Sequence, residues 1–254
     1  MHIVVTGGGT REYIDDVRVI TNVATGKISA LIIEKIIEVA IRKNLLSELK
    51  ITYIHTTDAV QPCASLTAIL HANYVAEKIV SVADAFVCLE RCVGCSDAVI
   101  HAMAVSDFIL KKDGSTKLKS DSKEAFIEYL SSRIDYAPKI IAQLRRWAPT
   151  AKLIGFKFEV GQDRNDLLDS GYRLLEKNNL DFVLANDKEE MKRCNEHIGH
   201  LIDKRKYTVQ CNGKDAIAES LAELLLGRVT QLDFLVRQNL KSFNEIEEVR
   251  LLWN

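Results

Sequence analysis

The sequence lacks an excess of either charge, because 34 lysines and arginines nearly balance 35 aspartates and glutamates and leave a formal net charge of −1. Proteins dedicated to nucleic acids need a basic excess on their binding face, so the balance argues against that class. No run of about eighteen apolar residues occurs, as a membrane-spanning helix would require. Met1 and His2 lead into an apolar stretch that has no signal-peptide pattern. We therefore expect a cytoplasmic protein that binds neither nucleic acid nor membrane.

A second cysteine pair at the spacing of a zinc site is also missing, although the chain has six cysteines. Without a secretory context these thiols are expected to be reduced. The spacing of Cys88, Cys92 and Cys95 matches the iron–sulfur motif of radical enzymes, but those enzymes carry it in an early loop. The alternative is that Cys88 and Cys92 are small core residues of a helix.

The dinucleotide-binding motif G-x-G-x-x-G is absent as well, although three consecutive glycines follow the first apolar stretch. The strand expected at 51–55 ends in Thr56 and Thr57, with no acidic residue to bind a ribose hydroxyl. Tyr74 and Lys78 match the catalytic pair of short-chain dehydrogenases but lack its helix and its upstream serine. An NAD(P)-dependent reductase therefore remains only an alternative.

Strand-like and helix-like segments alternate along the 254 residues. They predict an α/β fold, a Rossmann-like and mostly parallel sheet with helices on both faces, plus a lysine-rich flap at 108–123. Residues 1–229 are expected to form one domain and 230–254 a tail of unknown role, whereas 56–77 give no clear pattern. We expect strands at 3–5, 51–55, 78–82, 97–101, 153–158, 182–184, 200–203 and 206–210, and helices at 28–43, 83–92, 137–148, 165–178 and 215–225.

The segment between the first strand and the first helix is the strongest functional candidate. It starts with Gly7, Gly8, Gly9 and Thr10, and a long irregular connection at this place is typical of a binding loop. Glycines allow backbone N–H groups to approach a ligand, and helix N-termini favour anions. The segment also carries Arg11, Arg18, Asn22, Gly26 and Lys27. These features predict a site for a phosphorylated small molecule.

Other candidates follow later strands, whose carboxyl ends should meet at one edge of the sheet. Asp107 follows the strand at 97–101 and is a candidate for ribose or metal contact, or else a turn cap. Lys117 and Lys119 alternate in the flap, either as solvated residues or as cations that close over a polyphosphate. Arg173 and Lys177 are like charges at i,i+4 on one helix, either a solvated face or a pair whose repulsion an anionic ligand would relieve.

Five segments of the chain resemble, in the same order, the motifs of phosphopantothenate–cysteine ligases, which act in coenzyme A biosynthesis. The opening GGGTREYIDDVRVITNVATGK is similar to G-G-T-x-E-x-I-D-x-V-R-x-I-x-N-x-S-S-G-K and is the most specific match. AMAVSDF resembles A-A-V-A-D, and KLK at 117–119 resembles K-I-K-K. IGFKFE at 154–159 resembles G-F-A-A-E, and LDFVLAND at 180–187 resembles L-D-x-I-x-A-N-D.

The resemblance implies a ligase that joins 4′-phosphopantothenate and L-cysteine through an acyl-nucleotide and releases pyrophosphate. It implies Mg²⁺ and a nucleoside triphosphate, which is CTP in most bacterial members and ATP in animal ones. It also implies a homodimer. Because the chain begins at the ligase signature, we expect the monofunctional form, with the flavin-dependent phosphopantothenoylcysteine decarboxylase encoded separately.

The resemblance also implies roles for individual residues. Asn22 would hold the substrate carbonyl and the acyl-nucleotide, and Lys117 would act on the triphosphate. The remaining residues would bind the nucleotide or its phosphates: Gly7, Gly8, Gly9, Thr10, Arg18, Gly26, Lys27, His101, Ala102, Met103, Asp107, Phe156, Arg173 and Lys177. The metal ligands stay unassigned.

The chain departs from the family pattern at several positions. Ala24 and Thr25 replace Ser-Ser, and Lys157 with Phe158 replaces Ala-Ala near the nucleotide, so the choice between CTP and ATP stays open. Lys139 stands where an aspartate after proline is common. Arg173 and Lys177 are shifted by one position from the family's lysines. A non-catalytic nucleotide-binding regulator is a further alternative, against which the matches at Asn22 and Lys117 count.

Overall fold

The computed structural model of the chain describes residues 1–111 and 122–227. It contains two compact units. The first is formed by Met1–Ala30 and Lys50–Ala151, and the second by Leu31–Leu49 and the chain from Lys152 onward. The expected tail at 230–254 and most of the expected flap lie outside the described residues.

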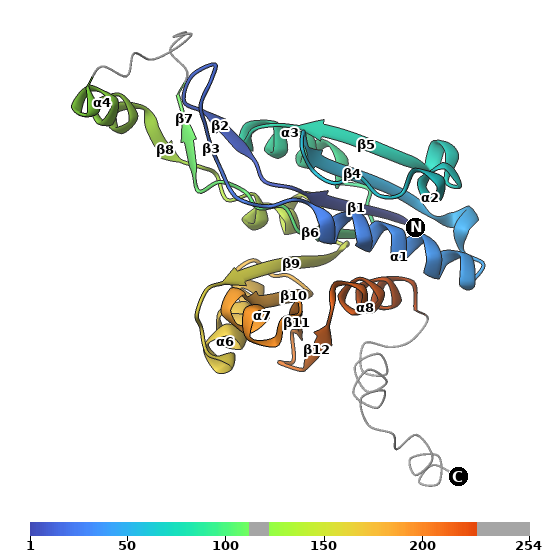
Figure 1. The fold of residues 1–254 in the computed structure, drawn as a ribbon. Helices are drawn as coiled ribbons and strands as arrows, with labels where there is room; N and C mark the ends of the chain where they lie inside the picture. The colour runs from blue at the N-terminus through green and yellow to red at the C-terminus, as the bar shows by residue number, and fades with distance from the viewer. Residues whose placement is uncertain (112–121, 228–254) are drawn as a thin grey trace. The chain divides into compact units, whose positions relative to one another are not determined.

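The first unit is built on four parallel strands in the order β6-β1-β4-β5 (Figure 1). Three of them, β1, β4 and β6, are buried along nearly their whole length. β1 and β6 are rich in Ile, Val and Ala, whereas β4 also buries Thr52, His55 and Thr56. Thr6 of β1 lies opposite Ile54 of β4 and His101 of β6. The carboxyl ends of these strands therefore share one edge. The strand bounds are β1 His2–Gly7, β4 Lys50–Thr56, β5 Tyr74–Ile79 and β6 Ala98–His101.

The expected strand at 78–82 has the wrong bounds. β5 begins at Tyr74 and ends at Ile79, and Val82 starts helix α3 (Val82–Cys92). The alternation of β5 is weak because most of this edge strand is exposed. Ser81 ends the strand by capping α3 in a reciprocal pair with Asp84. The unclear segment before β5 forms the short helices α2 (Ala64–Ala68) and η2 (His71–Asn73).

A small subdomain of the first unit, which we call the apolar arm, consists of two hairpin-like ribbons and a helix. β2 pairs antiparallel with β3, and β7 pairs antiparallel with β8 (Figure 1). The connection after β1 was expected to be irregular, so the β2–β3 ribbon is a correction. The bounds are β2 Arg11–Tyr13, β3 Val19–Thr21, β7 Phe108–Leu110, α4 Lys123–Arg133 and β8 Ile134–Tyr136. The expected helix at 137–148 is present only as η3 (Ile140–Ala142) and α5 (Leu144–Trp147).

The second unit is built on β9, β10, β11 and β12, in that order. β9 and β10 are parallel, whereas β11 and β12 continue antiparallel. A cluster of Leu167, Ala185 and Ile202 packs helix α6 on these strands. The bounds are β9 Lys152–Glu159, α6 Arg164–Lys177, β10 Phe182–Asp187, α7 Lys188–Cys194, β11 Ile198–Asp203 and β12 Thr208–Asn212.

The strand expected at 182–184 is longer than its sequence pattern indicates. Asn186 and Asp187 were expected to end it, but they pair with Phe158 and Glu159 of β9 and are buried. Asp187 accepts hydrogen bonds from the backbone N–H groups of Glu189 and Glu190 and so caps α7. A buried polar pair is therefore part of the strand because its hydrogen bonds are satisfied.

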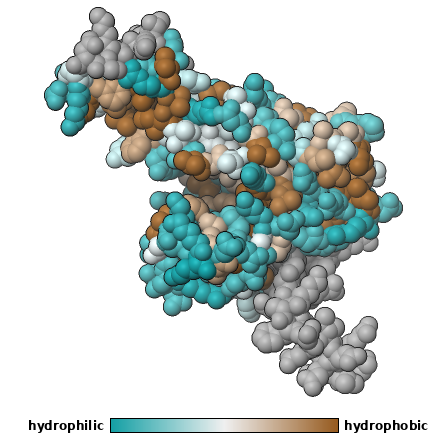
Figure 2. All heavy atoms as spheres, viewed as in Figure 1, coloured by the Kyte–Doolittle hydropathy of each residue, from teal (hydrophilic) through white to brown (hydrophobic). Residues whose placement is uncertain are grey.

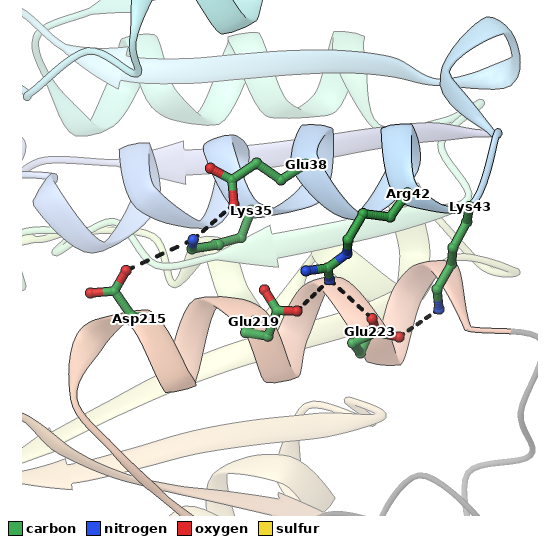
Figure 3. Close-up of polar contacts among 7 residues, drawn as sticks. All are labelled: Lys35, Glu38, Arg42, Lys43, Asp215, Glu219 and Glu223. Atoms are coloured by element: carbon green, nitrogen blue, oxygen red, sulfur yellow. Dashed lines mark hydrogen bonds and ion pairs between the residues drawn. The ribbon is translucent and has the colours of Figure 1, made fainter.

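Helix α1 (Lys27–Arg42) and helix α8 (Lys214–Leu226) face each other through a row of charges in the second unit (Figure 3). Arg42 pairs with Glu219 and also with Glu223, at 3.3 Å for the latter, and Lys43 pairs with Glu223. Nearer the start of α8, Lys35 lies 3.9 Å from Asp215. We call these residues the α1–α8 charge row. The short helix η1 (Leu46–Glu48) follows α1.

The predicted fold class, a Rossmann-like and mostly parallel α/β architecture, is confirmed by the two strand groups and their helical connections. Among the residues that the structure describes, no helix is long and apolar enough to cross a membrane. Cys88 and Cys92 lie on α3, as the helix interpretation predicted, with their sulfur atoms 4.0 Å apart. Burial raises the pKa of the Cys88 thiol to about 11.

Candidate functional site

The glycine loop at the end of β1 is packed so closely that side chains do not fit. A Cβ on Gly7 would lie 2.5 Å from the Tyr53 hydroxyl and 2.8 Å from Ser29. Gly8 has a φ of 87°, in the left-handed region, and a Cβ there would overlap the Thr56 hydroxyl. The glycines are therefore required by the neighbouring strand β4 and by the first turn of α1.

Residues 22–27 fold back onto the glycine loop. The Asn22 carbonyl oxygen lies 2.6 Å from where a Gly9 Cβ would be, and a Cβ on Gly26 would lie 3.2 Å from the Gly8 nitrogen. Gly26 has a φ of 70° and immediately precedes Lys27, the first residue of α1. The first turn of this helix contains no acidic residue, so its positive end is not neutralised locally.

The segment after β6 runs alongside the glycine loop. The Ala104 N–H donates to the Gly8 carbonyl at 2.9 Å, and the Thr10 N–H donates to the Ala104 carbonyl at 3.1 Å. The Ser106 N–H donates to the Thr10 hydroxyl at 2.9 Å. The Asn22 side-chain amide donates to the Val105 carbonyl at 3.1 Å. The structure thus brings Gly7–Thr10, Asn22, Gly26 and residues 102–107 together in the first unit.

His101 is buried at the end of β6 and is held by Thr6. The Thr6 hydroxyl lies 3.1 Å from His101 Nδ1 and accepts the Met103 N–H at 3.1 Å. With the Met103 N–H as one donor, the Thr6 hydroxyl can still donate its own proton to Nδ1 when His101 is protonated on Nε2. Burial lowers the pKa of His101 to about 4. His101 is therefore a neutral imidazole at physiological pH.

Asp107 lies at the outer end of this segment and is largely exposed. Its carboxylate Oδ1 accepts a hydrogen bond from the Lys139 ammonium, and its backbone carbonyl accepts the Ala137 N–H at 2.9 Å. Two contacts therefore tie residues 137–139 to Asp107. The turn-cap alternative is not seen in these contacts, because the Asp107 side chain is paired with a lysine.

The arginines of the opening segment are engaged by carboxylates. Arg18 lies 3.2 Å from the buried Asp15 and stacks over the ring of Phe126. Arg11 pairs with Asp58, which follows β4. Lys27, by contrast, is exposed, and no side-chain partner for it is present in the described residues. Phosphate binding by Arg18 stays a prediction, since it would require exchange of its carboxylate partner.

Phe156, Arg173 and Lys177 belong to the second unit. Phe156 is a half-buried residue of β9 that pairs with Leu184 of β10. Arg173 and Lys177 are exposed on α6, one turn apart, as their spacing predicted. Their part in binding a nucleotide stays a prediction.

The same unit contains a buried carboxylate. Burial by itself would raise the pKa of Asp187, but backbone N–H groups from Glu190, Gln162 and Glu189 outweigh it and hold that pKa below its ordinary value. This carboxylate is therefore ionised and fixed in the fold at neutral pH.

Two other sequence candidates can be placed. Lys117 lies outside the described residues. Tyr74 and Lys78 lie on strand β5 and not on a helix, so the dehydrogenase-like pair lacks its required setting. Burial raises the pKa of Tyr74 to about 12, which disfavours the ionised form. Within residues 1–111 and 122–227, no group of three or more His, Cys, Asp or Glu side chains is arranged to hold a metal ion.

Three residues that sequence reasoning missed shape this region. Tyr53 packs against two glycines, Thr6 fixes His101, and Lys139 reaches Asp107. Tyr53 and Thr6 were inside expected strands or beside them, where only strand register reveals their contacts. The sequence shows Lys139 as a departure from the family pattern, but it does not predict that Lys139 pairs with Asp107.

Comparison with known proteins gives consistent matches. The model of the DNA/pantothenate metabolism flavoprotein C-terminal domain matches residues 1–228. The coenzyme A biosynthesis bifunctional protein CoaBC of Thermococcus kodakarensis is 30% identical over 184 residues, which are 72% of this chain and 40% of that protein. The CoaBC protein of Methanocaldococcus jannaschii is 27% identical over 224 residues, 87% of this chain and 49% of that protein. The chain thus spans half or less of the length of these relatives.

Solved structures share the fold. The DNA/pantothenate metabolism flavoprotein from Streptococcus pneumoniae has a TM-score of 0.71 and 28% identity, and the match covers 89% of this chain and 98% of that one. A Cab2 H337A structure in complex with phosphopantothenate-cysteine has a TM-score of 0.66 at 15% identity, covering 94% of this chain and 88% of that one, and so shows the fold alone. The chain therefore belongs to the family of DNA/pantothenate metabolism flavoprotein C-terminal domains.

Proposed function

We propose that the chain is a phosphopantothenate–cysteine ligase of coenzyme A biosynthesis. The observation that carries the proposal is the junction of three segments in one unit, where the glycine loop, Asn22 and residues 102–107 are joined by hydrogen bonds. These segments carry the family motifs in sequence order. The curated relatives are named for coenzyme A biosynthesis, and the Cab2 structure holds the product that the proposal assigns.

The proposed reaction has two steps. The carboxylate of 4′-phosphopantothenate attacks the α-phosphorus of CTP or ATP, and pyrophosphate leaves with formation of an acyl-nucleotide. The amine of L-cysteine then attacks the acyl carbon, and the nucleoside monophosphate leaves. Both steps bring negative groups together, so fixed N–H donors and cations lower the barrier by stabilising charge as it develops. The product would be the substrate of a flavin-dependent decarboxylase.

The residues of the first unit support these roles in different ways. Glycine-loop N–H groups and the start of α1, whose first turn has no acidic residue, suit phosphate oxygens. Asn22 is oriented by the Val105 carbonyl, so its side-chain oxygen stays able to accept a hydrogen bond from substrate. Asp107 offers a carboxylate for a ribose hydroxyl. A nucleotide-binding role for Phe156, Arg173 and Lys177 is proposed from the family resemblance alone.

Mg²⁺ is proposed to arrive with the triphosphate. The described residues offer no set of three ligands, and Mg²⁺ in nucleotide sites is commonly held by phosphate oxygens and water with only one or two protein carboxylates. The ion would offset the charge of the leaving pyrophosphate.

We also propose that the chain acts as a homodimer in the cytoplasm. The apolar arm carries exposed Val17, Ile127 and Tyr136, which are 67%, 53% and 81% exposed, and further exposed apolar residues lie on the same ribbons. Figure 2 shows hydrophobic residues gathered on the visible face beside α4. Contiguous exposed apolar surface of this kind is typical of a protein–protein interface, and a second copy of the chain would cover it.

The test is an assay with 4′-phosphopantothenate, L-cysteine, Mg²⁺ and either CTP or ATP. Pyrophosphate release and the mass of phosphopantothenoylcysteine would be measured together. Omitting cysteine should leave a single burst of about one pyrophosphate per site, because activation precedes the attack of the amine. A chain that binds the nucleotide but releases no pyrophosphate would be a regulator. NADPH oxidation without pyrophosphate release would identify a reductase.

Lys117→Gln tests the flap residue. We expect pyrophosphate release to fall to background, since the neutral side chain removes the cation assigned to the triphosphate. The melting temperature should match that of the unchanged chain. Normal turnover by the variant would remove Lys117 from the mechanism.

A further inference from the structure

Lys139 is placed beside the glycine loop by a chain of contacts. Thr10 of the loop accepts the Ser106 N–H, Asp107 follows directly, and the Asp107 carbonyl accepts the Ala137 N–H. The Lys139 side chain then returns to the Asp107 carboxylate. The Lys139 ammonium is thus held beside Asp107, the residue after Ser106, which is bonded to the glycine loop.

The contact between Lys139 and Asp107 leaves hydrogen-bonding atoms of both side chains available to a ligand. Lys139 and Asp107 are 65% and 67% exposed. Their contact uses one carboxylate oxygen, Oδ1, and for Oδ2 no partner is found in the described parts of the chain. An ammonium has three N–H donors, of which this contact uses one. A ligand can therefore bind the carboxylate and the ammonium at the same time.

Exposure distinguishes Lys139 from the two arginines of the loop, because all three cations are paired with an aspartate. Arg11 and Arg18 are 32% and 30% exposed, whereas Lys139 is 65% exposed and can reach a further anion. Asp107 by itself would repel a triphosphate, and an ammonium at hydrogen-bond distance cancels that repulsion. A sugar hydroxyl on Oδ2 and a phosphate oxygen on the ammonium would both be satisfied.

We propose that Lys139 is a nucleotide-binding residue that contacts the phosphate groups while Asp107 binds the sugar. The proposal rests on the proposed nucleotide-dependent function and adds a residue to it. It predicts that loss of the Lys139 ammonium lowers the affinity for the nucleoside triphosphate but not the affinity for the nucleoside. A lysine that merely orients Asp107 would affect both ligands equally.

The experiment is isothermal titration of the full chain with CTP and, separately, with ATP, whether or not either nucleotide supports turnover. The binding of cytidine and of adenosine is measured by competition. Lys139→Met should weaken triphosphate binding about tenfold or more, the effect of losing one charge-assisted hydrogen bond. Nucleoside binding should stay within about twofold, since that ligand lacks the phosphates. Lys139→Arg should restore most triphosphate affinity because it keeps the charge.

Lys204→Met is the matched control, because Lys204 is also an exposed lysine paired with an aspartate, Asp181, at 2.8 Å. It should leave triphosphate binding unchanged. Equal losses for triphosphate and nucleoside in Lys139→Met, or no loss for either, would overturn the proposal. Pyrophosphate release by the unchanged chain is measured separately. If the unchanged chain releases no pyrophosphate but Lys139→Met weakens triphosphate binding selectively, the ligase proposal is refuted and the role of Lys139 stands. If the chain is active but the variant shows no selective loss, only the role of Lys139 is refuted.

Discussion

At the scale of single residues, the candidate site depends on glycine positions that have no space for a Cβ atom. Gly8 combines a left-handed backbone with contact to Thr56 and Ala59. Gly161 has a similar φ of 76°, but nothing lies within 4 Å of its Cβ position. The two glycines therefore separate the effect of backbone strain from the effect of crowding.

Gly8→Ala should lower stability by more than Gly161→Ala, which bears only the left-handed strain of about 1 kcal/mol. The added methyl also pushes Thr56 and the loop apart, so we expect pyrophosphate release to fall strongly. Urea unfolding and the ligase assay measure the two effects. Equal losses of stability in both variants would show that the packing around Gly8 is not tight.

His101 gives a prediction about pH. Its folded pKa of about 4 lies below the ordinary value of 6.5, so between these values the unfolded chain binds the proton and the folded chain does not. Stability from this group is present above pH 6.5 and is lost as the pH falls toward 4. From pH 7 to pH 5 the loss should be roughly 2 kcal/mol.

The variant His101→Asn should remove this contribution while its side-chain oxygen still faces the Thr6 hydroxyl. Urea unfolding at pH 7 and pH 5 compares the two chains. The unchanged chain should lose more stability on acidification than the variant. An identical loss in both would mean that His101 can be protonated in the folded chain.

At the scale of elements, helices with a regular apolar spacing were predictable and their partners were not. The pattern in residues 28–43 placed α1 within one residue of its observed start and end. The pairing of α1 with α8 through the α1–α8 charge row could not be read from spacing, because the residues are about 180 positions apart. Helix α4 was not expected, and none of its residues is buried.

Glu223 accepts contacts from both Arg42 and Lys43, so it is the residue on which the charge row depends most (Figure 3). Glu223→Gln should lower the free energy of unfolding by up to about 1 kcal/mol at low salt, and by less in high salt. Glu90→Gln on α3 is the control, since Glu90 is exposed and has no ion pair in the described residues. Equal effects of the two variants would show that the row adds nothing to stability.

At the scale of the whole molecule, the apolar arm is the surface that the sequence failed to show. Its exposed residues Phe108 and Tyr136 come from strands β7 and β8, which are separate segments of the chain. The centroids of their rings lie 5.6 Å apart in a tilted arrangement. Such a surface exists only after the ribbons have paired. It is the physical basis of the proposed dimer.

Tyr136→Asp should convert the proposed dimer to a monomer, because it places a charge in the centre of an apolar contact. Sedimentation velocity measures the mass of both chains. Tyr207→Asp is the control, since Tyr207 is an exposed tyrosine of the second unit, 51% exposed. A monomeric unchanged chain, or a variant that stays dimeric, would contradict an interface at the arm.

The sequence alone determined the elements and the chemistry of short segments. Glycines 7–9, the apolar run of β1 and the family motifs are local features, and local features are read directly from residue type and spacing. They predicted the α/β class and a phosphate-binding loop after β1. The bounds of β5 and β10 were wrong because an exposed edge and a buried polar end mask the strand pattern.

The tertiary structure alone decided which side chains meet. Thr6 reaches His101 only because strand register sets them side by side, and Lys139 reaches Asp107 only because residues 137–139 return to the loop after β6. Arg11 and Arg18 acquired carboxylate partners in the same way. Contacts between distant residues depend on packing and register, and these are properties of the folded chain as a whole.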